Sequence, residues 1–212
     1  MMRYIDFHTH RVPDAQNVVA VVDGRDTWGI HPWKSLPAPI PGGAGERVPF
    51  PFGMGSEPAA RILAIGECGL DALRGPSMDI QEQVFRQQIA LGEEMGRPLV
   101  VHCVKAIDRL LQLRRELRPA MPWMIHGFRG KPRQLQSLLD AGLYVGFGFF
   151  HNDESLLLCP LERMMTETDD SPLPIEELYE NVAAKRGIDV AELCSAMAEN
   201  YRSFFQKEPL TA

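Results

Sequence analysis

The feature that most constrains the fold of this chain is a regular alternation of short apolar runs with longer segments of helical periodicity. The runs with strand character are residues 61–67, 98–102, 123–126, 143–147 and 163–166. The segments with helical character are residues 79–95, 106–117, 132–141, 175–186 and 190–205. Strands that alternate with helices form βαβ units, in which the strands lie parallel in one sheet. The sequence therefore predicts an α/β fold.

The length of the chain favours one architecture within that class. The chain has 212 residues, of which 45% are hydrophobic, and single (β/α) barrels often have about 200–250 residues. Strands are also predicted at residues 3–7, 17–22 and 27–31, with too little chain between them for the usual helices. We therefore expect a shortened (β/α)8 TIM barrel that forms a single domain over residues 1–212.

One segment does not fit the alternating pattern. Residues 35–58 carry many Pro and Gly residues and show little periodicity, which predicts a loop. A loop of this length without secondary structure is unusual inside a compact domain. The sequence leaves three explanations open: a lid, a disordered excursion, or the remnant of a lost helix.

Residues that commonly bind metal ions stand at the ends of the predicted strands. His8 and His10 are one residue apart, so a β-strand directs both side chains to the same face. Further strands end in Glu67, His102, His126 and Asp169. In a barrel these strand ends converge on one mouth, where four imidazoles and two carboxylates can hold two divalent ions. Paired ions of this kind activate a water and stabilise the oxygens of a displacement, which suits hydrolysis of a phosphodiester.

Charge and composition narrow the classes of partner. With 22 basic and 28 acidic residues the net charge is −6, so the chain lacks the global basic surface of a protein that reads DNA sequence. Metal ions can still supply local positive charge for a polyanionic substrate. The N-terminus has no apolar signal-peptide region, and no apolar run approaches the roughly 18 residues of a membrane span. We therefore expect no membrane association, and the sequence indicates no obligate protein partner.

The cysteines indicate a compartment. Cys68, Cys103, Cys159 and Cys194 are widely separated, and none of them forms a Cys-x-x-Cys motif. Such spacing predicts reduced and mostly buried thiols, and hence a cytoplasmic protein.

Seven segments, in this order, carry a resemblance to a known family. They are DFHTH at 6–10, GIHPW at 29–33, IGECGLD at 65–71, VHC at 101–103, IHGF at 125–128, ETD at 167–169 and ENYRSFF at 199–205. With these segments the chain resembles the TatD-related metal-dependent deoxyribonucleases of the amidohydrolase superfamily. The resemblance spans nearly the whole chain, and it implies a distorted TIM barrel that hydrolyses phosphodiesters, typically at nucleic-acid ends.

The resemblance also implies a role for each candidate ligand. One ion would be held by His8, His10 and Asp169. The other would be held by His102 and His126, and Glu67 would bridge the two. Asp169 would in addition orient or deprotonate the attacking water, so that Glu67 and Asp169 are the candidate catalytic residues. The identity of the two divalent ions stays open among Mg²⁺, Mn²⁺ and Zn²⁺.

The candidate substrate contacts include a departure from the family pattern. The family usually has an arginine two positions after its third histidine, where this chain has Val104 followed by Lys105. Lys105 or Arg129 could supply the missing phosphate contact, although a lysine acts as a point charge and lacks the planar fork of an arginine. Arg11, which follows a predicted strand, and His31, which ends one, are further candidates.

These patterns favour a two-metal deoxyribonuclease, exonuclease-like, that acts on DNA ends or on another phosphodiester. One alternative is a small-molecule phosphoesterase, lactonase or amidase with the same centre, because the barrel is trimmed and the phosphate clamp altered. Another is a catalytically weak barrel kept for binding or regulation. The complete set of six ligands argues against this last alternative.

Overall fold

The computed structural model describes residues 3–36, 50–52 and 55–209. By the contacts within the chain it divides into two compact units. The middle unit is Gly24–Trp123, and the terminal unit combines Met1–Asp23 with Met124–Ala212. The organisation of residues 1–212 as a single domain stays a prediction, and the two units are described separately below.

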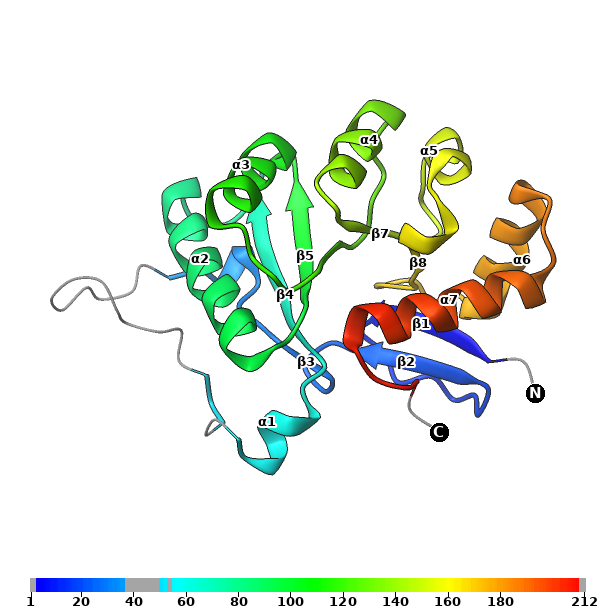
Figure 1. Cartoon of the computed structure of the whole chain (residues 1–212), viewed down its shortest axis with the longest axis horizontal. Coiled ribbons are helices and arrows are strands. Elements are labelled where there is room, and N and C mark those ends of the chain that lie inside the picture. Colours follow the sequence, from blue (N-terminus) through cyan, green and yellow to red (C-terminus); the bar gives the residue numbers. More distant parts are fainter. Residues whose placement is uncertain (1–2, 37–49, 53–54, 210–212) are drawn as a thin grey trace, which may run out of the picture. The chain divides into compact units, whose positions relative to one another are not determined.

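The middle unit is built on three parallel strands. They are β3 (Thr27–Trp28), β4 (Ala64–Asp71) and β5 (Leu99–Val104), paired in that order. Helix α2 (Met78–Met95) packs against β4, and α3 (Ile107–Leu117) packs against β5 (Figure 1). The helix α2 ends at Gly96, whose φ of +61° suits a residue without a Cβ. Parallel strands covered by helices are the βαβ arrangement that the sequence predicts.

The segment before β4 differs in part from the prediction. Residues 37–49 and 53–54 of the predicted loop lie outside the described residues. Its last residues begin a short helix, α1 (Glu57–Arg61), where Ser56 Oγ accepts a hydrogen bond from Ala59 N over 3.3 Å. The expectation that a strand starts at residue 61 is therefore wrong, because this capped turn extends through Arg61 and β4 begins at Ala64.

The terminal unit contains the remaining strands. β1 (Tyr4–Thr9) pairs with β2 (Val18–Val22) in parallel. β6 (Trp123–Ile125) begins at the boundary of the units and pairs with β7 (Tyr144–Phe147), which pairs with β8 (Met164–Thr166), again in parallel. The strands β6, β7 and β8 are short, and the loops that follow β6 and β8 carry candidate site residues.

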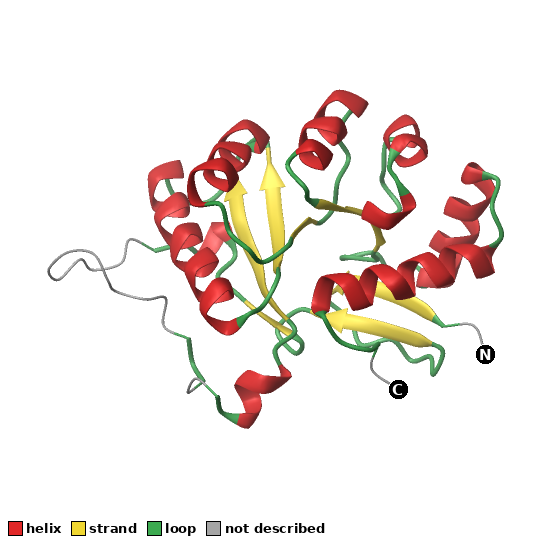
Figure 2. Ribbon diagram, in the orientation of Figure 1, coloured by secondary structure: helices red, strands yellow, loops and turns green. Residues whose placement is uncertain are grey.

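Helices accompany the strands of the terminal unit (Figure 2). They are α4 (Pro132–Asp140), α5 (Asp153–Leu158), α6 (Ile175–Arg186) and α7 (Val190–Phe205). The short 3-10 helix η2 (Leu161–Arg163) leads into β8. Helix α7 packs on β1 through Phe7, whose ring centroid lies 6.1 Å from that of Tyr201 and 6.2 Å from that of Phe205. This aromatic core fixes the strand that carries His8.

Among the described residues no helix is both long and apolar enough to cross a membrane.

Candidate metal centre

The first cluster of candidate ligands lies in the terminal unit, where the chain after β8 runs beside the end of β1. Asp169 N donates to His8 O over 3.0 Å, and Asp169 O accepts from His10 N over 3.3 Å. These backbone hydrogen bonds place Asp169 Oδ1 3.7 Å from His8 Nε2 and 3.5 Å from His10 Nε2. The His8 side chain is fully buried, whereas that of His10 is 35% exposed. Three of the predicted ligands are thus brought together.

His126 joins this cluster from the loop after β6. The centroid of its ring lies 4.5 Å from that of His8. Ligand atoms of His8, His126 and Asp169 all lie within 4.8 Å of one another. Two imidazole nitrogens and a carboxylate oxygen are a donor set that suits a divalent transition metal ion. The residues present therefore fit an ion, and the assignment of His126 to the second ion stays a prediction.

The second cluster lies in the middle unit. His102 Nδ1 is 2.8 Å from Glu67 Oε1, and His31 Nε2 is 3.2 Å from the same oxygen. Ligand atoms of the three side chains lie within 4.8 Å of one another, and only 7% of the Glu67 side chain is exposed. The buried Glu67 carboxylate and the His102 imidazole are again donors that suit a divalent ion. His31, which the sequence suggested as a substrate contact, lies beside them, but its Nδ1 accepts from Trp33 N, so its Nε2 carries the proton and faces Glu67 as a donor.

Three of these residues do not occupy the strand ends that the sequence predicts. β4 continues past Glu67 to Asp71, and β5 continues past His102 to Val104. β3 stops at Trp28, and His31 instead caps the 3-10 helix η1 (Pro32–Lys34), where its Nδ1 accepts from Trp33 N over 3.1 Å. The strands β4 and β5 are longer because each pairs with its neighbour through these positions.

The glycines around Glu67 allow β4 to approach β5 closely. A Cβ on Gly66 would lie 2.6 Å from Val100 O, and one on Gly69 would overlap His102 O. Gly69 also has a φ of +133°, which side chains disfavour. The spacing Gly-Glu-Cys-Gly therefore brings the two strands into contact where Glu67 and His102 meet.

Asp71 is a site residue to which the sequence pattern assigns no role. Its Oδ2 lies 3.2 Å from His102 Nε2 and accepts from Trp33 Nε1 over 2.6 Å. Burial raises the pKa of Asp71, but hydrogen bonds from Trp33, Leu73 N and His102 lower the pKa below its ordinary value. A charged carboxylate behind a ligating histidine holds the ring in one orientation. The sequence does contain a signal for this role of Asp71, because the alternation of side chains along a strand places residues 67 and 71 on one face of β4.

Two further carboxylates of the terminal unit are buried behind the first cluster. Asp6 accepts from Thr168 N over 3.0 Å and from Thr168 Oγ1 over 2.6 Å, and burial raises the pKa of Asp6 to about 7. Glu167 accepts from Gly127 N, the residue after His126, and burial raises the pKa of Glu167 to about 8. These contacts fix the segments that carry Asp169 and His126.

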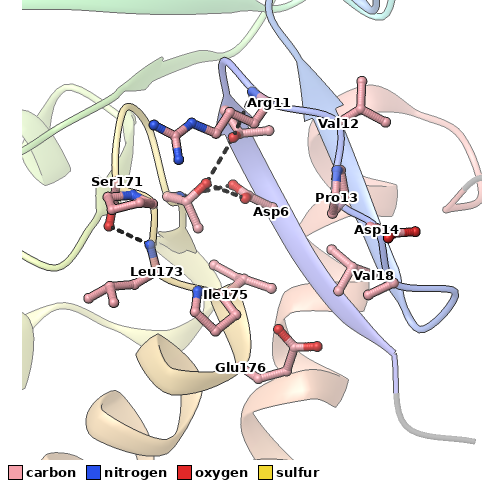
Figure 3. A pocket seen from close by; sticks show the side chains of 15 residues that line it. Asp6, Arg11, Val12, Pro13, Asp14, Val18, Ser171, Leu173, Ile175 and Glu176 are labelled. Atoms are coloured by element: carbon pink, nitrogen blue, oxygen red, sulfur yellow. Dashed lines mark hydrogen bonds between the residues drawn. The ribbon is translucent and has the colours of Figure 1, made fainter.

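The cationic side chains that are predicted to contact the substrate lie in different parts of the structure. Arg11 lines a pocket of about 310 Å³ whose walls include Asp6 and Thr168 but none of the candidate ligands (Figure 3). Lys105 is exposed directly after β5. Arg129 is exposed in the loop after β6 and lines a different pocket, which includes Asp169. Of the cations proposed in the terminal unit, the structure therefore associates Arg129, and not Arg11, with a candidate metal ligand.

Comparison with known sequences identifies relatives over most of the chain. The sequence model of the family described as TatD related DNase matches residues 12–206. The 3'-5' ssDNA/RNA exonuclease TatD of Erwinia amylovora is 31% identical over 174 residues, which cover 68% of this chain and 66% of that protein. The protein of the same name from Salmonella typhimurium is 30% identical over 172 residues, with 68% and 66% covered. The chain thus spans slightly less than two thirds of the length of these relatives.

Comparison with solved structures tests the fold. The TatD homologue YjjV from Escherichia coli superposes with a TM-score of 0.70 at 19% identity, covering 92% of this chain and 79% of that one. A TatD family hydrolase from Entamoeba histolytica gives a TM-score of 0.61 at 18% identity, covering 68% and 64%. This likeness confirms the predicted α/β fold of the distorted (β/α)8 class. The match of the family model over residues 12–206 confirms the resemblance as well, and this chain belongs to the TatD-related DNase family.

Proposed function

We propose that this protein is a metal-dependent phosphodiesterase that removes nucleotides from the ends of DNA. The convergence of His8, His126 and Asp169, with ligand atoms within 4.8 Å of one another, carries the proposal. Curated relatives named as 3'-5' ssDNA/RNA exonucleases support single-stranded nucleic acid as the substrate. These names do not favour either alternative, a small-molecule hydrolase or a barrel kept for binding.

The proposal includes two divalent ions and treats residues 1–212 as one hydrolase domain. Following the family resemblance, one ion is assigned to His8, His10 and Asp169. The other is assigned to His102 and His126, with Glu67 bridging. The donor sets in the two units support metal binding, and they suit Mn²⁺ or Zn²⁺, or Mg²⁺ when waters complete the shell. When bound, such ions lower the pKa of a water and offset the negative charge of a phosphate.

The side chains of the chain itself supply positioning and proton transfer. Asp169, held by backbone hydrogen bonds to the end of β1, orients the attacking water and accepts its proton. Thr168 and Asp6 lock the backbone just before Asp169, so that this carboxylate keeps its position between the histidines. Arg129 and Lys105 are the proposed phosphate contacts in place of the arginine usual in the family.

A cytoplasmic location is also part of the proposal. Burial raises the pKa of the Cys103 and Cys159 thiols to about 12. Such thiols stay protonated at neutral pH, and all four cysteines are free thiols, as is usual for proteins of a reducing compartment.

A panel of substrates tests the proposed function. The protein is stripped of metal, reloaded with Mg²⁺, Mn²⁺ or Zn²⁺, and given single-stranded DNA labelled at either end, duplex DNA, bis-p-nitrophenyl phosphate and a lactone. We expect stepwise release of nucleotides from one end of single-stranded DNA. Hydrolysis of the lactone with intact DNA would instead favour the small-molecule enzyme, and metal uptake without any turnover would favour the binding barrel.

A further inference from the structure

A second pocket of the terminal unit, of about 470 Å³, lies beside a candidate metal ligand. It is lined by the loops that follow β6, β7 and β8, and its residues include Asp169 and Arg129. This volume lies within the range of about 300–1,000 Å³ that small-ligand sites occupy. The pocket therefore has room for a single nucleotide at the point where the proposed chemistry takes place.

The lining of this pocket combines acidic and apolar residues. Glu167, Asp169 and Asp170 supply the acidic part. Phe150 and Leu173 supply apolar surface, and they are 71% and 44% exposed although large apolar side chains normally pack in the core. Arg129 also lines the pocket, and its guanidinium lies 5.3 Å from the centroid of the Phe150 ring.

Hydrogen bonds hold the loop that carries Phe150 in place. His151 Nδ1 donates to Gly148 O over 2.6 Å, which closes the loop around Phe150. Asn152 Oδ1 accepts from Ser155 N over 2.9 Å at the start of α5. Ser155 Oγ then donates to Gly130 O over 2.8 Å and ties this loop to the residue after Arg129. The exposed ring and the guanidinium are thus presented together by a braced structure.

We propose that Phe150 stacks on the base of the terminal nucleotide while Arg129 donates to the phosphate that links it to the rest of the strand. This inference rests on the proposed nuclease function and names the residues that hold its substrate. An aromatic ring stacks on any base, so the contact gives affinity without sequence preference. A guanidinium above the ring suits a phosphate attached to a stacked base, because it offers several donors in one plane.

An abasic substrate separates base stacking from other effects of Phe150. We compare KM for a single-stranded oligonucleotide with KM for the same strand lacking its terminal base, using the metal-loaded protein. Phe150→Ala should raise KM for the intact strand roughly 5- to 100-fold and leave KM for the abasic strand at the wild-type value. Phe150→Trp should restore the wild-type KM on the intact strand. Leu157→Ala, on an exposed position of α5, serves as the control and should change neither value.

Arg129→Ala tests the phosphate contact, because loss of that contact should raise KM for the intact and abasic strands alike.

If Phe150→Ala leaves both KM values unchanged while the wild type is active, the stacking proposal is overturned and the nuclease function stands. An equal rise in KM for both strands would also overturn the stacking proposal. So would a change in the sedimentation coefficient of the Phe150→Ala protein without a change in KM, because that result indicates that Phe150 lies in a protein contact. If the wild type releases no nucleotide with any metal, the nuclease function itself fails. Should Phe150→Ala not fold, Phe150→Leu takes its place with the same expected pattern.

Discussion

Asp71 Oδ2 lies 3.2 Å from His102 Nε2, while the other ring nitrogen of His102, Nδ1, lies 2.8 Å from Glu67 Oε1. In the tautomer that donates from Nε2 to Asp71, the Nδ1 lone pair of His102 is available to a metal ion beside Glu67. The indole N–H of Trp33 also donates to Asp71 Oδ2, over 2.6 Å. Asp71, itself held by Trp33, is therefore placed to orient His102 for metal binding.

Asp71→Asn should weaken metal binding at the His102 cluster by about 10- to 100-fold, because an amide is a weaker acceptor for the His102 proton. Titration calorimetry of the metal-free protein with Mn²⁺ or Zn²⁺ measures the change in Kd. The exposed Asp108→Asn in the same unit is the control and should leave Kd unaltered. Equal Kd values for Asp71→Asn and wild type would show that Asp71 does not orient His102.

Gly66→Ala should destabilise the protein, since the added Cβ would lie 2.6 Å from Val100 O in the neighbouring strand. We expect a loss of roughly 1–3 kcal/mol in the free energy of unfolding, measured in urea, as for other overpacked positions. Gly96→Ala is the comparison variant, because nothing lies within 4 Å of its added Cβ and only the φ of +61° opposes the change. A smaller loss for Gly66→Ala than for Gly96→Ala would mean that β4 and β5 separate easily.

Much of this fold could be predicted from the sequence where periodicity is long and its stop signals are clear. The helices at 175–186 and 190–205 are observed with the predicted bounds. The sequence predicts that β4 ends at Glu67, because Gly69 and Asp71 lack intrinsic strand preference, and that β5 ends at His102, whereas the strands run to Asp71 and Val104. Pairing between the strands overrides that preference, and pairing depends on a neighbour that is distant in sequence.

The candidate site was predictable in its residue types but not in its supporting contacts. Histidines and carboxylates next to apolar runs identified the candidate ligands. His31 caps the N-terminus of η1, and in this position its ring lies against Glu67. The strand pattern of the sequence does not predict such a cap. The burial of Asp6 and Glu167 depends on the tertiary path of residues 167–169, which a linear sequence does not contain.

Glu167 should make the metal-free protein less stable as the pH rises. Burial raises the pKa of Glu167 from 4.5 to about 8, so between these values the folded state keeps a proton that the unfolded chain has released. Its stabilising contribution is complete below pH 4.5 and is lost as the pH rises through about 8. Glu167→Gln should therefore gain stability relative to wild type across this range, measured by thermal melts with a chelator present. The exposed Glu162→Gln is the control, and parallel pH profiles for wild type and Glu167→Gln would contradict the prediction.

Glu82 should contribute stability with the opposite dependence on pH. Burial raises the pKa of Glu82, but hydrogen bonds from Arg109 Nε over 2.6 Å and Arg86 Nε over 2.9 Å lower it below 4.5 overall. The contribution is therefore present above pH 4.5 and lost as the pH falls through the lowered pKa. Glu82→Gln should cost roughly 0.5–1 kcal/mol in urea unfolding at pH 7, and less in acid. The exposed Glu57→Gln, which breaks a pair within α1, should cost less than Glu82→Gln, and an equal cost would contradict the role of the network.

The release of nucleotides from single-stranded DNA by stripped and reloaded protein tests the proposed metal-dependent nuclease most directly. The predicted result is no release after chelation, recovery on adding Mg²⁺, Mn²⁺ or Zn²⁺, and a loss of at least about 100-fold in Glu67→Gln and Asp169→Asn. Release that persists in the chelated protein, or reloaded protein that takes up metal and leaves the DNA intact, would contradict it.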